Sequence, residues 1–246
     1  MGFKSAVARN MLPLTREAGG GYLFVHEGVR FMLQNLRDPV SSLTHLAGAI
    51  LTIPYTAVLI GTAVHQASTR HIIAFAVFGV SLLLLYATSA AYHMPRFSEK
   101  AIRVLRRIDH MAIFVLIAGT YTPVCLLPLH GVWGWTLFGF VWGLAVTGIV
   151  LKAFWIQAPR WLSTAVYVLM GWLVLLAIYP LTQAVSATAV ALLVSGGLTY
   201  TAGAVMYAIK WPRRRWGYFG FHELFHLFVL GGSCLHAAFM FQLIPA

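Results

Sequence analysis

Residues 221–241, FHELFHLFVLGGSCLHAAFMF, form an apolar stretch that carries four ionisable side chains, His222, Glu223, His226 and His236. About 20 apolar residues span a bilayer, so this stretch is long enough to cross a membrane. Ionisable groups inside a span are costly and are usually kept for function. His222 and His226 are four residues apart, so on a helix both rings project from one face about one turn apart. The stretch therefore predicts a membrane helix that offers two nitrogens to one metal ion.

The composition of the whole chain predicts a polytopic membrane protein. Of the 246 residues, 60% are hydrophobic and 9% are charged, whereas soluble domains carry about 25% charged residues. The net charge of +11 could indicate nucleic-acid binding. The basic residues fall in short loops between apolar runs, however, where such residues set membrane topology. We therefore expect the lipid bilayer, and not nucleic acid, as the partner.

Seven apolar stretches of spanning length follow one another along the chain. Backbone groups in lipid must pair within their own segment, so each stretch is expected to form a helix. Pro54, Pro123 and Pro180 are expected to kink or end helices. The predicted fold is an all-α membrane protein with a seven-helix domain over residues 41–246. The predicted spans cover residues 43–64, 71–93, 108–129, 131–151, 161–180, 187–209 and 219–243.

The distribution of basic residues predicts the orientation. Residues 1–40 form a polar arm, in which 23–37 is either a short amphipathic helix on the inner leaflet or an ordinary loop. This arm and the loops after the second, fourth and sixth spans hold 16 of the 17 Lys and Arg residues, and the other side holds only Arg70. The positive-inside rule then places the N-terminus in the cytoplasm and the C-terminus outside. We expect a multi-pass protein of the inner, or plasma, membrane.

Polar residues of several spans are predicted to meet at one depth, in the cytoplasmic half of the membrane. Ser89 and His93 end the second span, Asp109 begins the third, and His222 and His226 begin the seventh. Three histidines with a position left for water are the pattern of catalytic zinc. Ser89 could reach that water or a substrate oxygen, and Asp109 could act as general base. The alternative is that each histidine is only a hydrogen-bonded packing residue.

Several motifs resemble the hemolysin III family, the bacterial branch of the progestin and adipoQ receptor group, which includes adiponectin receptors. They appear in the family's order over about residues 38–243. The motifs are DPVSSLTHLAGA (38–49), SAAYH (89–93), RIDHMAIFVLIAGTYTPV (107–124) and the stretch from Phe221.

The resemblance implies seven helices, a cytoplasmic N-terminus and zinc near the inner leaflet. It carries the ligand role onto His93, His222 and His226, and water-contacting roles onto Ser89 and Asp109. His45 and His236 match other family positions, to which we assign no role. Five glycines, Gly143, Gly148, Gly196, Gly197 and Gly203, are expected to permit close helix packing.

Four functions remain open at this point. The wider superfamily includes alkaline ceramidases, so the resemblance suggests a zinc-dependent hydrolase of a lipid amide, linked to membrane homeostasis. The same residues fit a receptor-like sensor of membrane fluidity. HELFH also matches a metalloprotease motif with Glu223 as base, although Glu223 points about 100° away from His222 and is more simply a partner for Arg or His. A channel is disfavoured, because the fourth and fifth spans offer almost no ionisable residues in their outer half. Cytolysis, which the family's name records, finds no support in the sequence, since we identify no secretion signal and no amphipathic toxin segment.

Overall fold

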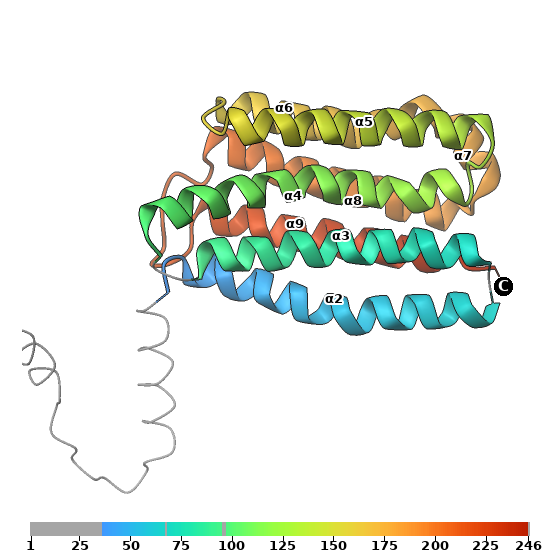
Figure 1. Ribbon diagram of the computed structural model, residues 1–246, viewed down its shortest axis with the longest axis horizontal. Coiled ribbons are helices and arrows are strands. Elements are labelled where there is room, and N and C mark those ends of the chain that lie inside the picture. Colours follow the sequence, from blue (N-terminus) through green and yellow to red (C-terminus); the bar gives the residue numbers. More distant parts are fainter. Residues whose placement is uncertain (1–35, 67, 95–96, 246) are drawn as a thin grey trace, which may run out of the picture. The chain divides into compact units, whose positions relative to one another are not determined.

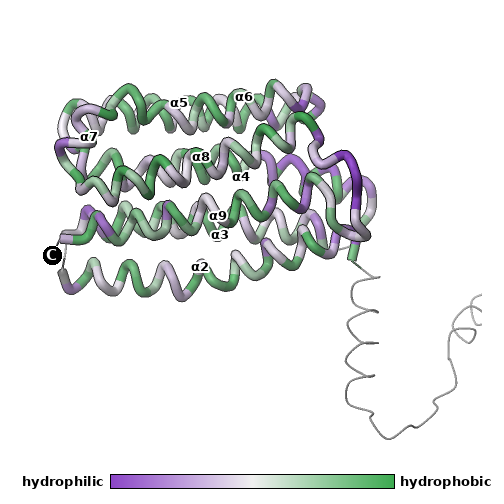
Figure 2. The backbone as a smooth tube through the Cα atoms, turned by 180° about the vertical axis from the view of Figure 1, so that it is seen from behind, coloured by the Kyte–Doolittle hydropathy of each residue, from purple (hydrophilic) through white to green (hydrophobic). Residues whose placement is uncertain are grey.

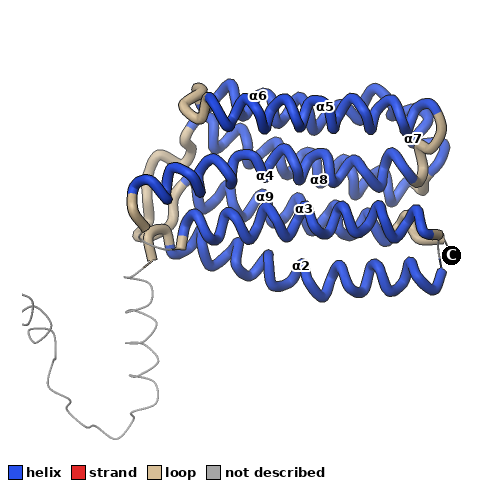
Figure 3. The backbone as a smooth tube through the Cα atoms, in the orientation of Figure 1, coloured by secondary structure: helices blue, strands red, loops and turns tan. Residues whose placement is uncertain are grey.

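The computed structural model describes residues 36–66, 68–94 and 97–245, and the regular structure in these ranges is helical (Figure 3). Seven helical runs of 21 to 28 residues are long and apolar enough to cross a membrane. The predicted all-α, seven-span fold is therefore confirmed. The predicted amphipathic segment, 23–37, lies outside the described residues except at its last two positions.

The spans are joined by short connections and run back and forth along one direction (Figure 1). The third span begins well before the predicted residue 108, because Glu99 starts a charged helical turn that hydropathy does not detect. The Ser98 hydroxyl caps this turn by accepting a hydrogen bond from the Ala101 backbone N–H. The helices are α2 (Pro39–Gln66), α3 (Thr69–His93), α4 (Glu99–Leu126), α5 (Val132–Phe154), α6 (Arg160–Gly171), α7 (Ile178–Ala184), α8 (Ala187–Ile209) and α9 (Phe221–Phe241).

The fifth span is interrupted by a 3₁₀ segment, Trp172–Ala177, between α6 and α7. Pro180 lies in the first turn of α7, where a missing N–H is tolerated. The same missing N–H prevents the α-helix before it from continuing without a break. Pro54 and Pro123 instead lie inside α2 and α4, and α4 ends three residues after its proline. Of the three prolines, Pro180 therefore accompanies the clearest change in helix geometry.

The order of packing brings the first and last spans together. Helix α3 packs between α2 and α4, while α9 packs against both α8 and α2. The Tyr55 hydroxyl on α2 donates a hydrogen bond to the Ala237 carbonyl on α9, at 3.0 Å. This arrangement places the C-terminal end of α3 beside the N-terminal end of α9, although the two are separated by more than 100 residues.

Close approach of the helices depends on some glycines and not on others. A Cβ at Gly148 would meet the Phe114 ring, and one at Gly203 would meet Phe228. A Cβ at Gly196 would likewise meet the His236 ring. The prediction for Gly143 was wrong, because nothing lies within 4 Å of that position.

Large apolar side chains cover the outer surface of the helices, as lipid contact requires. Leu51 on α2 and Leu169 on α6 are 66% and 70% exposed. Hydrophilic segments gather at the end of the bundle where α8 joins α9 (Figure 2). The spans are surrounded by hydrocarbon, so the exposed apolar side chains, such as Leu51 and Leu169, form the membrane-facing surface. The chain is a multi-pass membrane protein.

Candidate metal site

Three histidines converge where α3 ends and α9 begins. His93 is the last residue of α3, and His222 and His226 occupy the first two turns of α9. One ring nitrogen from each can be chosen so that all three lie within 4.8 Å of one another. The Nε2 atoms of His93 and His222 are 3.2 Å apart. The structure thus brings together the three residues that the sequence analysis selected as ligands.

The start of α9 is held by Glu223. Its carboxylate accepts a hydrogen bond from the Gly220 backbone N–H at 2.8 Å and a longer one from the Ser41 hydroxyl on α2 at 3.4 Å. The first contact satisfies a backbone donor at the helix N-terminus, where a negative charge is also favoured. Among the described residues, no Arg or His pairs with Glu223. A carboxylate used in this way is poorly suited to the base role of a metalloprotease.

Asp38 orients His93, and the sequence analysis did not identify it. The His93 Nδ1–H donates a hydrogen bond to the Asp38 carboxylate at 2.9 Å, which leaves the Nε2 lone pair directed at the other histidines. Burial acts to raise the pKa of Asp38. The hydrogen bonds that His93 and Arg37 donate outweigh burial and lower this pKa to about 2. The sequence signal that could have identified Asp38 is its position directly before Pro39 in the DPVSSLTH motif.

The geometry of the three histidines fits a metal ion. Two nitrogens bound tetrahedrally to zinc at 2.0–2.1 Å are about 3.3 Å apart, which is close to the 3.2 Å between His93 and His222. The Nδ1 atom of His226 is buried and has no hydrogen-bond partner among the described residues. A hydrogen-bonded outer partner such as Asp38 is typical of metal-ligating histidines. The three histidines could therefore hold a metal.

A fourth histidine, His45 of α2, packs against the cluster without belonging to it. Its ring stacks on the His226 ring with centroids 3.8 Å apart and planes 20° apart. It is buried, and neither ring nitrogen has a hydrogen-bond partner within the described part of the chain. The stacking places His45 above one candidate ligand, where it restricts the rotation of that ring.

One large cavity joins the histidines to the other predicted site residues. Its volume is about 600 Å³, and its walls include His222, His226, Ser89 and Asp109. Ser89 is 2% exposed. Cavities of about 300–1,000 Å³ are typical of small-molecule sites. The structure therefore places both predicted catalytic residues on the same cavity as two of the three histidines.

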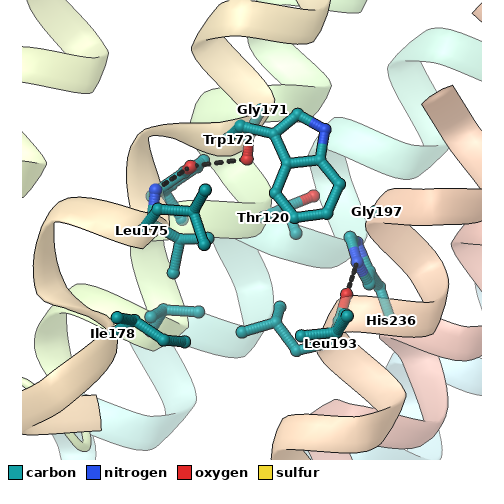
Figure 4. Close-up of a pocket in the computed structure, with 12 residues that line it drawn as sticks. Thr120, Gly171, Trp172, Leu175, Ile178, Leu193, Gly197 and His236 are labelled. Atoms are coloured by element: carbon teal, nitrogen blue, oxygen red, sulfur yellow. Dashed lines mark hydrogen bonds between the residues drawn. The ribbon is translucent and has the colours of Figure 1, made fainter.

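His236 lies deeper in the bundle, at a smaller pocket beside the interruption of the fifth span (Figure 4). Its Nε2–H donates to the Leu193 carbonyl at 3.1 Å. At the same pocket, the Tyr121 hydroxyl donates to the Gly171 carbonyl at 2.7 Å and accepts from the Val174 N–H at 2.8 Å. The Tyr121 contacts satisfy backbone groups that the interrupted helix leaves without α-helical partners, and His236 also lines the larger cavity.

The fold and the histidine cluster define a class: a seven-helix membrane protein with a candidate metal site near one end of the bundle. Residues 33–237 match the Haemolysin-III-related family, and the chain belongs to this family.

Individual relatives agree with that assignment. Hemolysin-3 of Bacillus cereus is 38% identical over 83% of this chain and 90% of its own length. The Hemolysin-3 homolog of Bacillus subtilis is 43% identical over 78% of this chain and 87% of its own length. The adiponectin receptor protein of Drosophila melanogaster is 25% identical over 87% of this chain and 54% of its own length. The resemblance to the hemolysin III family and its wider receptor group is thereby confirmed.

Proposed function

We propose that this protein is a zinc-dependent hydrolase of a ceramide-like lipid amide, acting in the inner leaflet and contributing to membrane homeostasis. The observation that carries the proposal is the shared cavity: His222 and His226 line it together with Ser89 and Asp109. Long apolar side chains line the same cavity, as an acyl chain would require. Leu85, Leu116 and Val229 are among them.

Zinc is the metal that we propose for the three histidines. His93, His222 and His226 would hold it through ring nitrogens. A bound zinc ion supplies a Lewis acid that polarises a carbonyl and lowers the pKa of water. Asp38 would keep the His93 ring in the required tautomer.

Asp109 transfers the proton, and Ser89 orients the amide group of the substrate. The Asp109 carboxylate accepts a proton from the attacking water and returns it to the leaving amine nitrogen as the C–N bond breaks. The Ser89 hydroxyl donates a hydrogen bond to the amide oxygen, on which negative charge develops. General acid–base catalysis of this kind accelerates a reaction by about 10²–10⁴-fold.

A receptor-like sensor of membrane state is the second candidate. The name of the Drosophila relative, adiponectin receptor protein, favours it. In this case the cavity binds a lipid without turnover, and the metal stabilises the junction between α3 and α9. The names of the two Bacillus relatives refer to hemolysis, for which we propose no mechanism here.

The test is metal analysis together with lipid-amide turnover by detergent-purified protein. We expect about one zinc per chain, absent from His93→Ala and from the double variant H222A/H226A. Asp109→Asn should keep the zinc and lose about 10²–10⁴-fold in turnover. Glu99→Gln is the matched control, because that carboxylate is exposed and its ion pair, with Arg103, is on the surface.

Zinc without turnover of any lipid amide would reject the hydrolase and favour the sensor. If protein purified without chelator contained no metal, both the zinc-dependent hydrolase and the metal-stabilised sensor would be rejected. If Asp109→Asn turned over substrate at the wild-type rate, Asp109 would not be the base.

A further inference from the structure

Three cationic side chains line the same cavity, away from α3 and α9, which carry the three histidines. They come from three helices: Arg106 from α4, Lys152 from α5 and Arg160 from α6. Among the described carboxylates, only Asp109 lines this cavity. This part of the wall therefore carries an excess of positive charge, and we call Arg106, Lys152 and Arg160 together the cationic wall.

Lys152 is the decisive member of this cationic wall. It is only 6% exposed, although a lysine that merely sets topology can stay in water. Its ammonium group has three donors, and the single hydrogen bond in the described structure goes to the uncharged Ser163 hydroxyl. Burying a charge without an opposite charge is costly. An anionic ligand would supply the missing partner.

Arg160 connects the cationic wall to the histidine cluster. Its guanidinium lies over the rings of Tyr207 and Phe221, at 4.8 Å and 5.4 Å from their centroids. Tyr207 also contacts His222, with ring centroids 5.6 Å apart. One guanidinium nitrogen of Arg160, Nη1, is buried and has no hydrogen-bond partner among the residues described.

The remaining walls decide what kind of anion fits. Beside the cations, the cavity is lined by apolar residues of α3, α4 and α9, including Leu85, Ile113, Leu116 and Val229. A free phosphate would leave these walls without a partner. An amphiphile fills both parts, with its anion at the cations and its acyl chain along the apolar side chains.

We propose that the cavity binds lipids whose headgroup carries a phosphate or a carboxylate, held by Lys152, Arg106 and Arg160. Only the prediction of turnover rests on the proposed function. If the protein is that hydrolase, its preferred substrate is an N-acylated lipid with an anionic headgroup. Binding itself requires the cations and not the metal.

The experiment measures binding of two fluorescent lipids with the same acyl chains, phosphatidic acid and diacylglycerol, to the detergent-purified protein. We expect phosphatidic acid to bind at least about tenfold more tightly, the effect of one hydrogen bond to a charged group. Lys152→Gln and Arg106→Gln should each weaken phosphatidic acid about tenfold and leave diacylglycerol unchanged. Lys152→Arg should keep the preference, because it keeps the charge.

Arg107→Gln is the matched control, because Arg107 neighbours Arg106 on α4 and does not line the cavity. Equal binding of the two lipids by the wild type would overturn the proposal. An equal loss in Arg107→Gln would do the same, since it would reveal only general charge attraction. Displacement of the lipid by inorganic phosphate at comparable concentration would show a free-anion site instead.

The double variant H222A/H226A separates this inference from the proposed hydrolase. It should bind phosphatidic acid with the wild-type preference while lacking metal and turnover. If the wild-type protein shows the preference but hydrolyses no lipid amide, the headgroup site is supported and the enzyme is rejected.

Discussion

At the scale of single residues, the candidate metal site depends on Asp38 as well as on the histidines. Asp38 lies just before α2, and its carboxylate reaches the Nδ1 atom of His93 at the end of α3. The contact fixes which ring nitrogen faces the cluster. A neighbouring carboxylate also makes an imidazole a more basic ligand. Asp38 is thus a positioning residue for the proposed metal.

Asp38→Asn should lower the affinity for zinc by about 10–100-fold, the usual effect of losing such an outer partner. The amide can keep a hydrogen bond to His93 but lacks the charge that strengthens the ligand. Competition with a metal-binding dye would measure the change.

The control for Asp38→Asn is again Glu99→Gln, whose side chain is 94% exposed. An Asp38→Asn protein with wild-type zinc affinity would contradict the positioning role. An equal loss in Glu99→Gln would mean that the effect came from net charge.

At the scale of elements, the interruption of the fifth span is stabilised by another helix. The 3₁₀ segment leaves backbone groups of residues 171–174 without their α-helical partners, and no water in the bilayer core can replace them. Tyr121 of α4 accepts from one of these groups and donates to another. The fifth span is therefore tied to α4, which also carries Asp109.

Tyr121→Phe should reduce the free energy of unfolding by about 1–3 kcal/mol, because it removes two hydrogen bonds, each of which contributes about 0.5–1.5 kcal/mol. Unfolding in a titration with a denaturing detergent would measure it. Tyr179→Phe is the control, since Tyr179 is 76% exposed and such changes are usually within about 0.5 kcal/mol. Equal stabilities of the two variants would contradict the role of the Tyr121 hydroxyl.

At the scale of the whole molecule, the orientation in the membrane decides which leaflet the cavity serves. The cationic wall and the histidines belong to the end of the bundle whose loops hold most of the Lys and Arg residues. The positive-inside rule predicts that this end faces the cytoplasm. A lipid would then enter from the inner leaflet.

Alkaline phosphatase fusions test this orientation, because that enzyme needs disulfides and is active only outside the reducing cytoplasm. A fusion after residue 245 should be active, and one in the loop at residues 155–159 should be inactive. The reverse pattern would place the cavity in the outer leaflet. It would leave the site chemistry unchanged but reject the inner-leaflet substrate.

Local sequence signals were sufficient for the spans and for the three histidines. Apolar runs near 20 residues long identify membrane helices because lipid offers no partner for free backbone groups. The four-residue spacing of His222 and His226 is a property of one helix. The place of His93 at the end of its span matched theirs in predicted depth.

Contacts between distant segments decided the partners of the buried polar groups and the composition of the cavity wall. The pairing of Asp38 with His93 and that of Ser41 with Glu223 join residues 55 and 182 positions apart. A tyrosine of α4 forms hydrogen bonds to the interruption of the fifth span, and the cationic wall collects one side chain from each of three helices. Hydropathy and helical spacing describe one segment at a time. The partners of buried polar groups depend on which helices pack together, and only the tertiary structure determined them.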